Sequence, residues 1–170
     1  MNKQLCRPWV IAVLTVLLEA LDQWTKYLAV LFLKDQDPFV IIDGVFELHY
    51  LENRGAAFGI LQGQKVFFLI CTVLVLAVLA FYYNRMPLEK KYQPLRAVGV
   101  LLGAGAVGNL IDRMVQSYVV DFLYFKLIDF PIFNVADCYV TAGAILLAIL
   151  ILFVYKDEEL GFLSLKKKHE

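Results

Sequence analysis

The sequence has few of the side chains that most often bind metals or act as nucleophiles. Histidine occurs twice and cysteine three times in 170 residues, and the cysteines have the spacing of neither a disulfide framework nor a metal site. No glycine-rich loop ends in Lys-Ser or Lys-Thr, so phosphate-binding loop chemistry is not indicated. Ser117 and Cys138 are not accompanied by a histidine or an additional lysine that would act as their base.

The chain also lacks a net charge, because 16 Lys and Arg residues balance 16 Asp and Glu residues. This balance does not favour nucleic acid or an acidic partner. Apolar residues, in contrast, are abundant: 61% of the chain is hydrophobic and its mean hydropathy is +0.67. Soluble globular chains are about half apolar, and a chain of this length forms one domain at most.

Four apolar stretches are long enough to cross a bilayer, which takes about 20 helical residues. They are residues 8–33, 66–83, 94–114 and 135–155. We therefore expect a mainly α, polytopic membrane protein with residues 1–170 in a single domain. The first stretch is expected to be retained rather than cleaved, because it carries Glu19, Asp22 and Lys26 with no small-residue cleavage site before them.

Cations outside these stretches are distributed unevenly. Ten fall in the two tails, between the second and third stretches, or at the start of the third: Lys3, Arg7, Arg85, Lys90, Lys91, Arg96, Lys156, Lys166, Lys167 and Lys168. Four fall in the other two connections: Lys34, Arg54, Lys65 and Lys126. The positive-inside rule therefore predicts cytoplasmic termini, with residues 34–65 and 115–134 outside. His49 and His169 then lie on opposite sides of the membrane and cannot form one metal site or triad.

The first outer segment has the pattern of a β-hairpin. Residues 39–42 and 45–50 are mostly β-branched, aromatic or aliphatic, and Asp43-Gly44 between them is a strong turn signal. We expect a small β-region over residues 38–60 that rests at the membrane interface. The aromatic residues of the second outer segment are expected at headgroup depth. The cytoplasmic tail, residues 156–170, is charged and is expected to be loosely ordered.

Three charged residues in the first stretch, Glu19, Asp22 and Lys26, are spaced so that they share one helical face. One interpretation is a self-neutralising pair of Asp22 and Lys26 that faces protein. Another is that these two residues shape a cavity in the outer leaflet. The two are compatible, because a buried ion pair adds little stability yet can fix a specific geometry.

The third stretch combines small residues with a polar end. Gly99 and Gly103 have the spacing that lets helices approach closely, and packing is their expected role. Asn109, Asp112 and Arg113 share a face near the outer end. They are interpreted either as interhelical contacts with an interfacial ion pair, or as a polar pocket in which Asn109 and Arg113 bind carbonyl groups.

Asp121 and Asp137 are the most informative residues, because each adjoins an apolar run and acids at membrane depth are costly unless they serve a function. Asp137 has an alternative role, since an acid in the first turn of a helix is stabilised by the helix dipole. Asn134 is suited to cap the same helix. Asp121 has no such alternative. Because Asn109, Arg113 and Asn134 are expected to converge on the two aspartates, the pair is interpreted as functional.

Five motifs occur one after another along nearly the whole chain. They are Asp22 with Lys26, Asn53-Arg54-Gly55-Ala56-Ala57-Phe58, Gly108-Asn109-Leu110-Ile111-Asp112-Arg113, Val120-Asp121-Phe122 and Phe133-Asn134-Val135-Ala136-Asp137. Together they resemble the lipoprotein signal peptidase family, also called signal peptidase II. The resemblance implies that Asp121 and Asp137 are a catalytic aspartic pair. It also implies a set of residues that surround and support the site: Asn53, Gly55, Asn109, Arg113, Asn134, Asp22 and Lys26.

The same resemblance implies a fold and a substrate. The fold would have four transmembrane helices, a small extracytoplasmic β-sheet and a short extracytoplasmic helix, with residues 54–64 as a mobile cover. The substrate would be a bacterial prolipoprotein that carries diacylglycerol on a cysteine, cleaved just before that cysteine. Membrane lipid is the other expected partner, globomycin-type cyclic peptides are expected inhibitors, and no metal or cofactor is implied. A monomer is expected in the bacterial cytoplasmic (inner) membrane, with the active site at the outer face.

Water activation is the mechanism that an aspartic pair implies, because two nearby carboxyl groups do not both ionise easily. One alternative is a proton- or ion-coupled transporter in which Asp22, Lys26, Asp112 and Asp121 form a path. Such a path needs polar residues through the full bilayer depth, whereas the second and fourth stretches are nearly pure hydrocarbon. A second alternative is a non-catalytic membrane scaffold.

Overall fold

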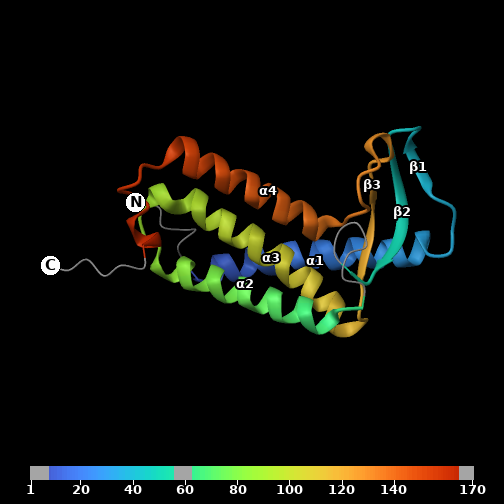
Figure 1. The fold of residues 1–170 in the computed structure, drawn as a ribbon, viewed down its shortest axis with the longest axis horizontal. Helices are drawn as coiled ribbons and strands as arrows, with labels where there is room; N and C mark the ends of the chain where they lie inside the picture. Colours follow the sequence, from blue (N-terminus) through green and yellow to red (C-terminus); the bar gives the residue numbers. More distant parts are fainter. Residues whose placement is uncertain (1–7, 56–62, 165–170) are drawn as a thin grey trace.

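The computed structural model describes residues 8–55 and 63–164, which form a bundle of four long helices with a small sheet at one end (Figure 1). The helices are α1 (Pro8–Leu33), α2 (Lys65–Arg85), α3 (Gln93–Val115) and α4 (Val135–Ile149). The sheet contains β1 (Phe39–Ile42), β2 (Phe46–Asn53) and β3 (Val119–Tyr124). Most of the cover expected at residues 54–64 lies outside the described residues.

Three helical segments of the described chain are long and apolar enough to cross a membrane: Lys65–Arg85, Lys90–Val115 and Val135–Val154. The last of these joins α4 to a π-helical segment, η5 (Leu150–Val154). No residue of α2 is buried, although the helix is almost entirely apolar, which fits a surface that faces lipid. α1 has the length of a span, with 26 residues, and it carries Glu19, Asp22 and Lys26.

α3 lies at the centre of the bundle and contacts each of the other three long helices. Two glycines allow the closest of these contacts. A Cβ atom on Gly105 would lie 2.5 Å from the backbone oxygen of Ala136, and one on Gly108 would lie 2.6 Å from Oδ2 of Asp22. Both distances are shorter than real Cβ contacts, so α1 and α4 come this close to α3 only because these positions have no side chain.

The two glycines expected to mediate packing behave differently. A Cβ atom on Gly99 would lie 2.9 Å from the ring of Tyr83 in α2, so this position does support close packing. A Cβ atom on Gly103 would meet no atom within 4 Å, and the prediction for Gly103 is therefore wrong. Spacing identifies small residues on a helix, but it does not show which of them face a neighbouring helix.

The sheet contains the predicted hairpin and one further strand. β1 and β2 pair antiparallel on either side of Asp43-Gly44, and Gly44 has a φ of +68°, which glycine adopts without steric cost. β3 pairs antiparallel with the other edge of β2, and it places Asp121 opposite Leu51. The sequence did not predict β3, because its partner strand is distant in the chain and no local turn links the two.

The sheet is attached to the end of α1 by apolar contacts. Val120 and Phe122 of β3 are buried against Ala29 of α1. Side chains alternate between the two faces of a strand. Because Val120 and Phe122 face α1, their neighbour Asp121 points to the opposite side of β3, toward α3 and α4.

At the other end of the bundle, the part of the tail that the structure describes, residues 156–164, is ordered rather than loose as expected. Residues 157–160 form turns, and η6 (Gly161–Leu163) is a short 3-10 helix. The ring of Phe162 packs edge-on against the buried ring of Tyr92, and Arg85 donates to the backbone oxygens of Phe162 and Ser164 at 3.0 and 2.7 Å. The aromatic contact and the arginine order the tail as far as Ser164, although its composition is charged.

Candidate active site

Asp121 is buried in the middle of β3, with 2% of its surface exposed. Its carboxylate accepts two hydrogen bonds from side-chain amides. Asn53, the last residue of β2, donates from Nδ2 to Oδ2 at 2.8 Å, and Asn134 donates from Nδ2 to Oδ1 at 2.6 Å. Both donors come from neighbouring elements, so the carboxylate is held only when β2, β3 and the start of α4 are assembled.

Asp137 lies in the first turn of α4 and has the role expected of a helix-start residue. Its backbone N–H donates to Oδ1 of Asn134 at 3.0 Å, and its Oδ2 accepts from the backbone N–H of Asn134 at 3.1 Å. This reciprocal pair is a capping box. The other oxygen, Oδ1, accepts from Nδ2 of Asn109 at 2.8 Å. Asp137 is therefore a capping residue that also faces a polar group of α3.

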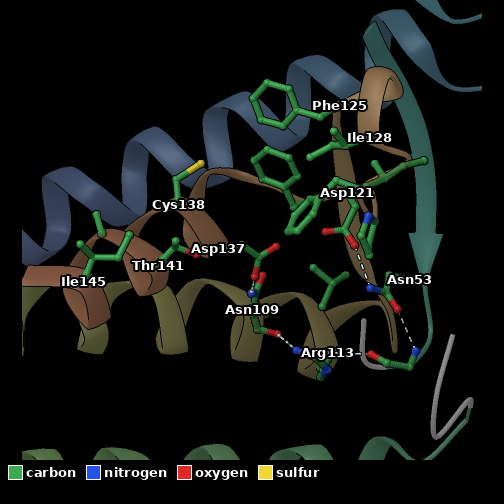
Figure 2. Close-up of a pocket in the computed structure, with 17 residues that line it drawn as sticks. Asn53, Asn109, Arg113, Asp121, Phe125, Ile128, Asp137, Cys138, Thr141 and Ile145 are labelled. Carbon is green, nitrogen blue, oxygen red and sulfur yellow. Dashed lines mark hydrogen bonds between the residues drawn. The ribbon is translucent and has the colours of Figure 1, made fainter. Parts of the chain in front are cut away.

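Both carboxyl groups line one cavity of about 750 Å³ (Figure 2). Of the residues predicted to surround the site, four also line it: Asn53, Gly55, Asn109 and Arg113. Asn134 is fully buried and contacts Asp121, Asp137 and Asn109 from behind. We call Asp121 and Asp137 the acidic pair.

Arg113 connects the end of α3 to the end of the sheet. Its guanidinium donates from NH2 to the backbone oxygen of Gly55 at 3.2 Å and from NH1 to the backbone oxygen of Asn109, also at 3.2 Å. The backbone N–H of Gly55 in turn donates to Oδ1 of Asn53 at 3.0 Å. The Oδ1 contact fixes the amide of Asn53 so that its Nδ2 faces Asp121.

Behind the cavity lies a buried ion cluster made of Asp22, Lys26 and Asp112. The Nζ atom of Lys26 lies 2.9 Å from Oδ2 of Asp22 and 3.0 Å from Oδ2 of Asp112, and all three residues are at most 3% exposed. The predicted pair of Asp22 and Lys26 is confirmed. Neither Asp22 nor Lys26 lines the cavity, so they do not form its walls, and a role in shaping it stays a prediction.

Gln23 is a member of this cluster that the sequence did not single out. Its Nε2 lies within hydrogen-bond distance of Asp22 Oδ2 at 3.2 Å, Asp112 Oδ1 at 3.0 Å and the backbone oxygen of Gly108 at 3.3 Å. Asp112 also accepts from the backbone N–H of Val120 at 3.2 Å, which ties α3 to β3. Spacing alone did not point to Gln23, because Gln23 directly follows Asp22, whereas Lys26 lies four residues after Asp22 on the same helical face.

The environment of Asp121 favours its protonated form. Burial removes water from the carboxylate and, together with the negative charge of Asp137, raises the pKa of Asp121 to about 7. The amide donors Asn53 and Asn134 act in the opposite direction but do not offset burial. A carboxyl group with such a pKa is available both as acid and as base near neutral pH.

The remaining walls of the cavity are apolar. One wall is a face of α4, formed by Cys138, Thr141, Ala142 and Ile145. The other is the connection between β3 and α4, formed by Phe125, Ile128, Phe130, Pro131, Ile132 and Phe133. The sequence placed these aromatic residues at headgroup depth, but it did not show that they enclose a cavity beside the acidic pair.

Taken together, the fold and the cavity define a membrane protein with a buried acidic pair beside an apolar cavity. Comparison with known proteins then identifies its family. The family model of signal peptidase (SPase) II matches residues 14–153, which is most of the chain. The chain belongs to the signal peptidase II family, and it is an aspartic-type membrane hydrolase.

Individual relatives agree with this assignment. The chain is similar to a lipoprotein signal peptidase from Streptococcus thermophilus (strain CNRZ 1066), with 46% identity over 87% of this chain and 94% of the relative. A lipoprotein signal peptidase from Caldanaerobacter subterraneus subsp. tengcongensis is also 46% identical, over 78% of this chain and 89% of the relative. A solved bacterial membrane enzyme has a TM-score of 0.74 at 34% identity, covering 96% of this chain and 94% of that structure.

Proposed function

We propose that this protein removes the signal peptide from bacterial prolipoproteins that carry diacylglycerol on a cysteine, by cleaving the peptide bond before that cysteine. The observation that supports this proposal most directly is the acidic pair in one cavity with an apolar wall. Family membership supports the reaction class. The carboxyl groups would act on the peptide bond, and the apolar wall would accept the acyl chains.

The proposed reaction is direct attack by water. One member of the acidic pair is ionised and removes a proton from water, while the other is protonated and donates to the carbonyl oxygen of the scissile bond. The N–H donors around the pair are fixed before the substrate arrives, so little reorganisation is needed when charge develops. The newly protonated carboxyl group then gives its proton to the amide nitrogen, while the other carboxylate takes a proton from a hydroxyl of the tetrahedral intermediate. The C–N bond breaks, and the amine and the new carboxylic acid leave. No residue forms a covalent bond to the substrate in this scheme.

The polar groups that line the cavity would bind the peptide backbone. Arg113 has guanidinium N–H groups beside Gly55, and Asn53 and Asn109 face the cavity with amide groups. The cavity thus offers polar groups near the acidic pair and apolar groups along α4 and the outer connection. A lipidated cysteine next to a peptide bond has the same division into apolar and polar parts.

We further propose that α1 is a fourth transmembrane helix, with both termini in the cytoplasm and the acidic pair at the outer face. Its length of 26 residues is sufficient to span a bilayer. Asp22 and Lys26 lie in the half of α1 that is nearer the sheet, and Glu19 lies near the middle of the helix. The excess of cations in the tails supports the same orientation. Accessibility of single cysteines placed in the sheet and in the tail to a membrane-impermeant thiol reagent tests this. In cells, labelling of the tail but not of the sheet would contradict it.

Cleavage of a lipidated precursor tests the function. The purified protein is incubated in detergent with a diacylglyceryl precursor peptide and, separately, with the same peptide lacking the lipid, and products are identified by mass. We expect cleavage before the cysteine of the lipidated peptide only, inhibited by a globomycin-type cyclic peptide. No cleavage of either peptide, together with proton flux in proteoliposomes, would contradict the peptidase and favour the transporter.

A further inference from the structure

Asn109 occupies the position between the buried ion cluster and the acidic pair. Its Oδ1 accepts from Nζ of Lys26 at 3.0 Å and from Nδ2 of Asn134 at 3.1 Å. Its Nδ2 donates to Oδ1 of Asp137 at 2.8 Å. One amide group therefore receives a hydrogen bond from a cation on one side and gives one to a carboxylate on the other.

The direction of this amide matters, because an asparagine side chain can rotate so that its oxygen and nitrogen exchange places. Rotation of Asn109 would bring its oxygen against the carboxylate of Asp137 and its NH2 group against the ammonium of Lys26. Lysine has three donors and no acceptor, so of the two amide atoms of Asn109 only the oxygen can form a hydrogen bond with Lys26. Lys26 thus permits a single orientation, in which Asn109 donates to Asp137.

Lys26 also pairs with two buried carboxylates on the side away from Asn109. It is 3% exposed, and its charge is balanced by Asp22 at 2.9 Å and Asp112 at 3.0 Å. Gln23 lies within hydrogen-bond distance of both carboxylates and reduces their freedom to move. Lys26 does not line the cavity, so its connections to the acidic pair are the hydrogen bond to Asn109 and its charge, and not contact with a substrate.

We propose that Lys26 is a positioning residue for the hydrolysis: it fixes Asn109 as a hydrogen-bond donor to Asp137, and so favours Asp137 as the ionised member of the acidic pair. This inference rests on the proposed function. Asp137 then activates water, and Asp121 carries the shared proton. The amides that donate to Asp121 are those of Asn53 and Asn134, and their oxygens accept from backbone N–H groups rather than from a cation. The buried cluster contributes to catalysis although none of its members touches the reacting atoms.

Substitution of Lys26 alone does not separate this role from charge balance, because Lys26→Met leaves Asp22 and Asp112 buried without a cation. The double variant Lys26→Met with Asp112→Asn removes one positive and one negative charge and keeps similar side-chain volumes. We expect Lys26→Met to lower the thermal unfolding temperature in detergent, and the double variant to recover most of that loss. The matched control is Asp112→Asn alone.

Steady-state cleavage of the lipidated precursor gives the decisive readout. In the double variant we expect kcat to fall by about 10- to 100-fold, as for other losses of positioning, with KM within about twofold of the wild-type value. Lys26→Met alone also removes a positive charge near the acidic pair. For this single variant we expect the pH optimum of cleavage to move to a higher value, because ionised carboxylates become less favourable.

Two outcomes would overturn the proposal. If the double variant regains the wild-type kcat as well as the wild-type unfolding temperature, Lys26 serves only to balance charge. If KM rises while kcat is unchanged, Lys26 acts on substrate binding. Asp121→Asn and Asp137→Asn are measured in parallel: if either retains wild-type turnover, the proposed function itself fails, and this result is independent of Lys26.

Discussion

Asn134 and Asp137 cap the same helix reciprocally, each accepting the backbone N–H of the other, at 3.0 Å (Asp137 N–H to Asn134 Oδ1) and 3.1 Å (Asn134 N–H to Asp137 Oδ2). The Nδ2 group of Asn134 also donates to Asp121 at 2.6 Å. One asparagine, Asn134, thus forms the capping box of α4 and also holds Asp121 in line with Asp137. The same contacts that start the helix also set the position of the proposed catalytic groups.

Substitutions of Asn134 separate these two roles. Serine caps helices about as well as asparagine, but its hydroxyl is too short to reach Asp121 while it caps α4. We expect Asn134→Ser to keep most of the stability and to reduce cleavage, whereas Asn134→Ala loses about 1 kcal/mol more of unfolding free energy. Thermal unfolding and cleavage rate, measured for both variants, check this. Wild-type cleavage by Asn134→Ser would contradict a role for its Nδ2 group.

Removal of either carboxylate should stop cleavage. We expect Asp121→Asn and Asp137→Asn each to lower the cleavage rate by roughly 100- to 10,000-fold, the range for loss of a general acid or base. The protein should still insert in the membrane, because asparagine has nearly the same shape and accepts hydrogen bonds. Turnover of the lipidated precursor is measured after purification of each variant at equal yield.

A matched control for these variants lies in the connection between β3 and α4. Asp129 is exposed, does not line the cavity and has a φ of +47°, a conformation that asparagine also tolerates. Asp129→Asn makes the same chemical change, and we expect wild-type cleavage. A loss of activity in this control would show that the acidic pair is not specifically required.

Cleavage should depend on pH near neutrality. Burial and the charge of Asp137 raise the pKa of Asp121 to about 7, so the proton needed for donation to the carbonyl is lost as pH rises above that value. We expect the cleavage rate to fall on the alkaline side of about pH 7. A rate that stays constant from pH 6 to pH 9 would show that no such proton is required.

The same pKa shift affects stability, which also decreases as the proton is lost. The folded protein holds the proton of Asp121 up to about pH 7, whereas an exposed aspartate loses it near the usual value of 3.8. Between these values the folded state binds more protons than the unfolded state, so the free energy of unfolding decreases as pH rises. In Asp121→Asn this decrease should be smaller, which denaturation at a series of pH values measures.

Glycine substitutions test the packing of α3. A methyl group on Gly108 would lie 2.6 Å from Asp22, whereas one on Gly103 would meet no atom within 4 Å. We expect Gly108→Ala to cost about 1–3 kcal/mol through overpacking. Gly103→Ala is the control and should leave the unfolding temperature unchanged or slightly raised. Equal effects at the two positions would contradict the close approach of α1 to Gly108.

Local patterns in the sequence predicted much of this molecule. The apolar stretches became α1 to α4, Asp43-Gly44 became the hairpin turn, and the pair of Asp22 and Lys26 forms within one helix. Each of these depends on residues that are near each other in the chain. Asp121 and Asp137 stood out for a related reason, because the cost of an acid beside an apolar run is a local property.

Features that depend on distant contacts were missed. β3 forms only by pairing with β2, which is distant in the chain. Asp112 of α3 pairs with Lys26 of α1, and Phe162 in the tail packs against Tyr92. The apolar walls of the cavity come from two separate segments that one-dimensional patterns cannot bring together. For residues 156–164 composition gave the wrong expectation, since the contact of Phe162 with Tyr92 and the hydrogen bonds from Arg85 order a charged segment. Residues 165–170 of the predicted tail lie outside the described residues.

The wall of the cavity that descends along α4 from Cys138 to Ile145 is about 10 Å long. Because α4 belongs to a helical segment that is long and apolar enough to cross a membrane, we expect an inhibitor that follows this wall to Asp137 to arrive from the hydrocarbon. Its effective concentration would then be its mole fraction in the bilayer or micelle. Added lipid or detergent dilutes such a compound even when its total concentration is constant. Inhibitor potencies measured at different lipid contents therefore become comparable only when they are expressed per mole of lipid.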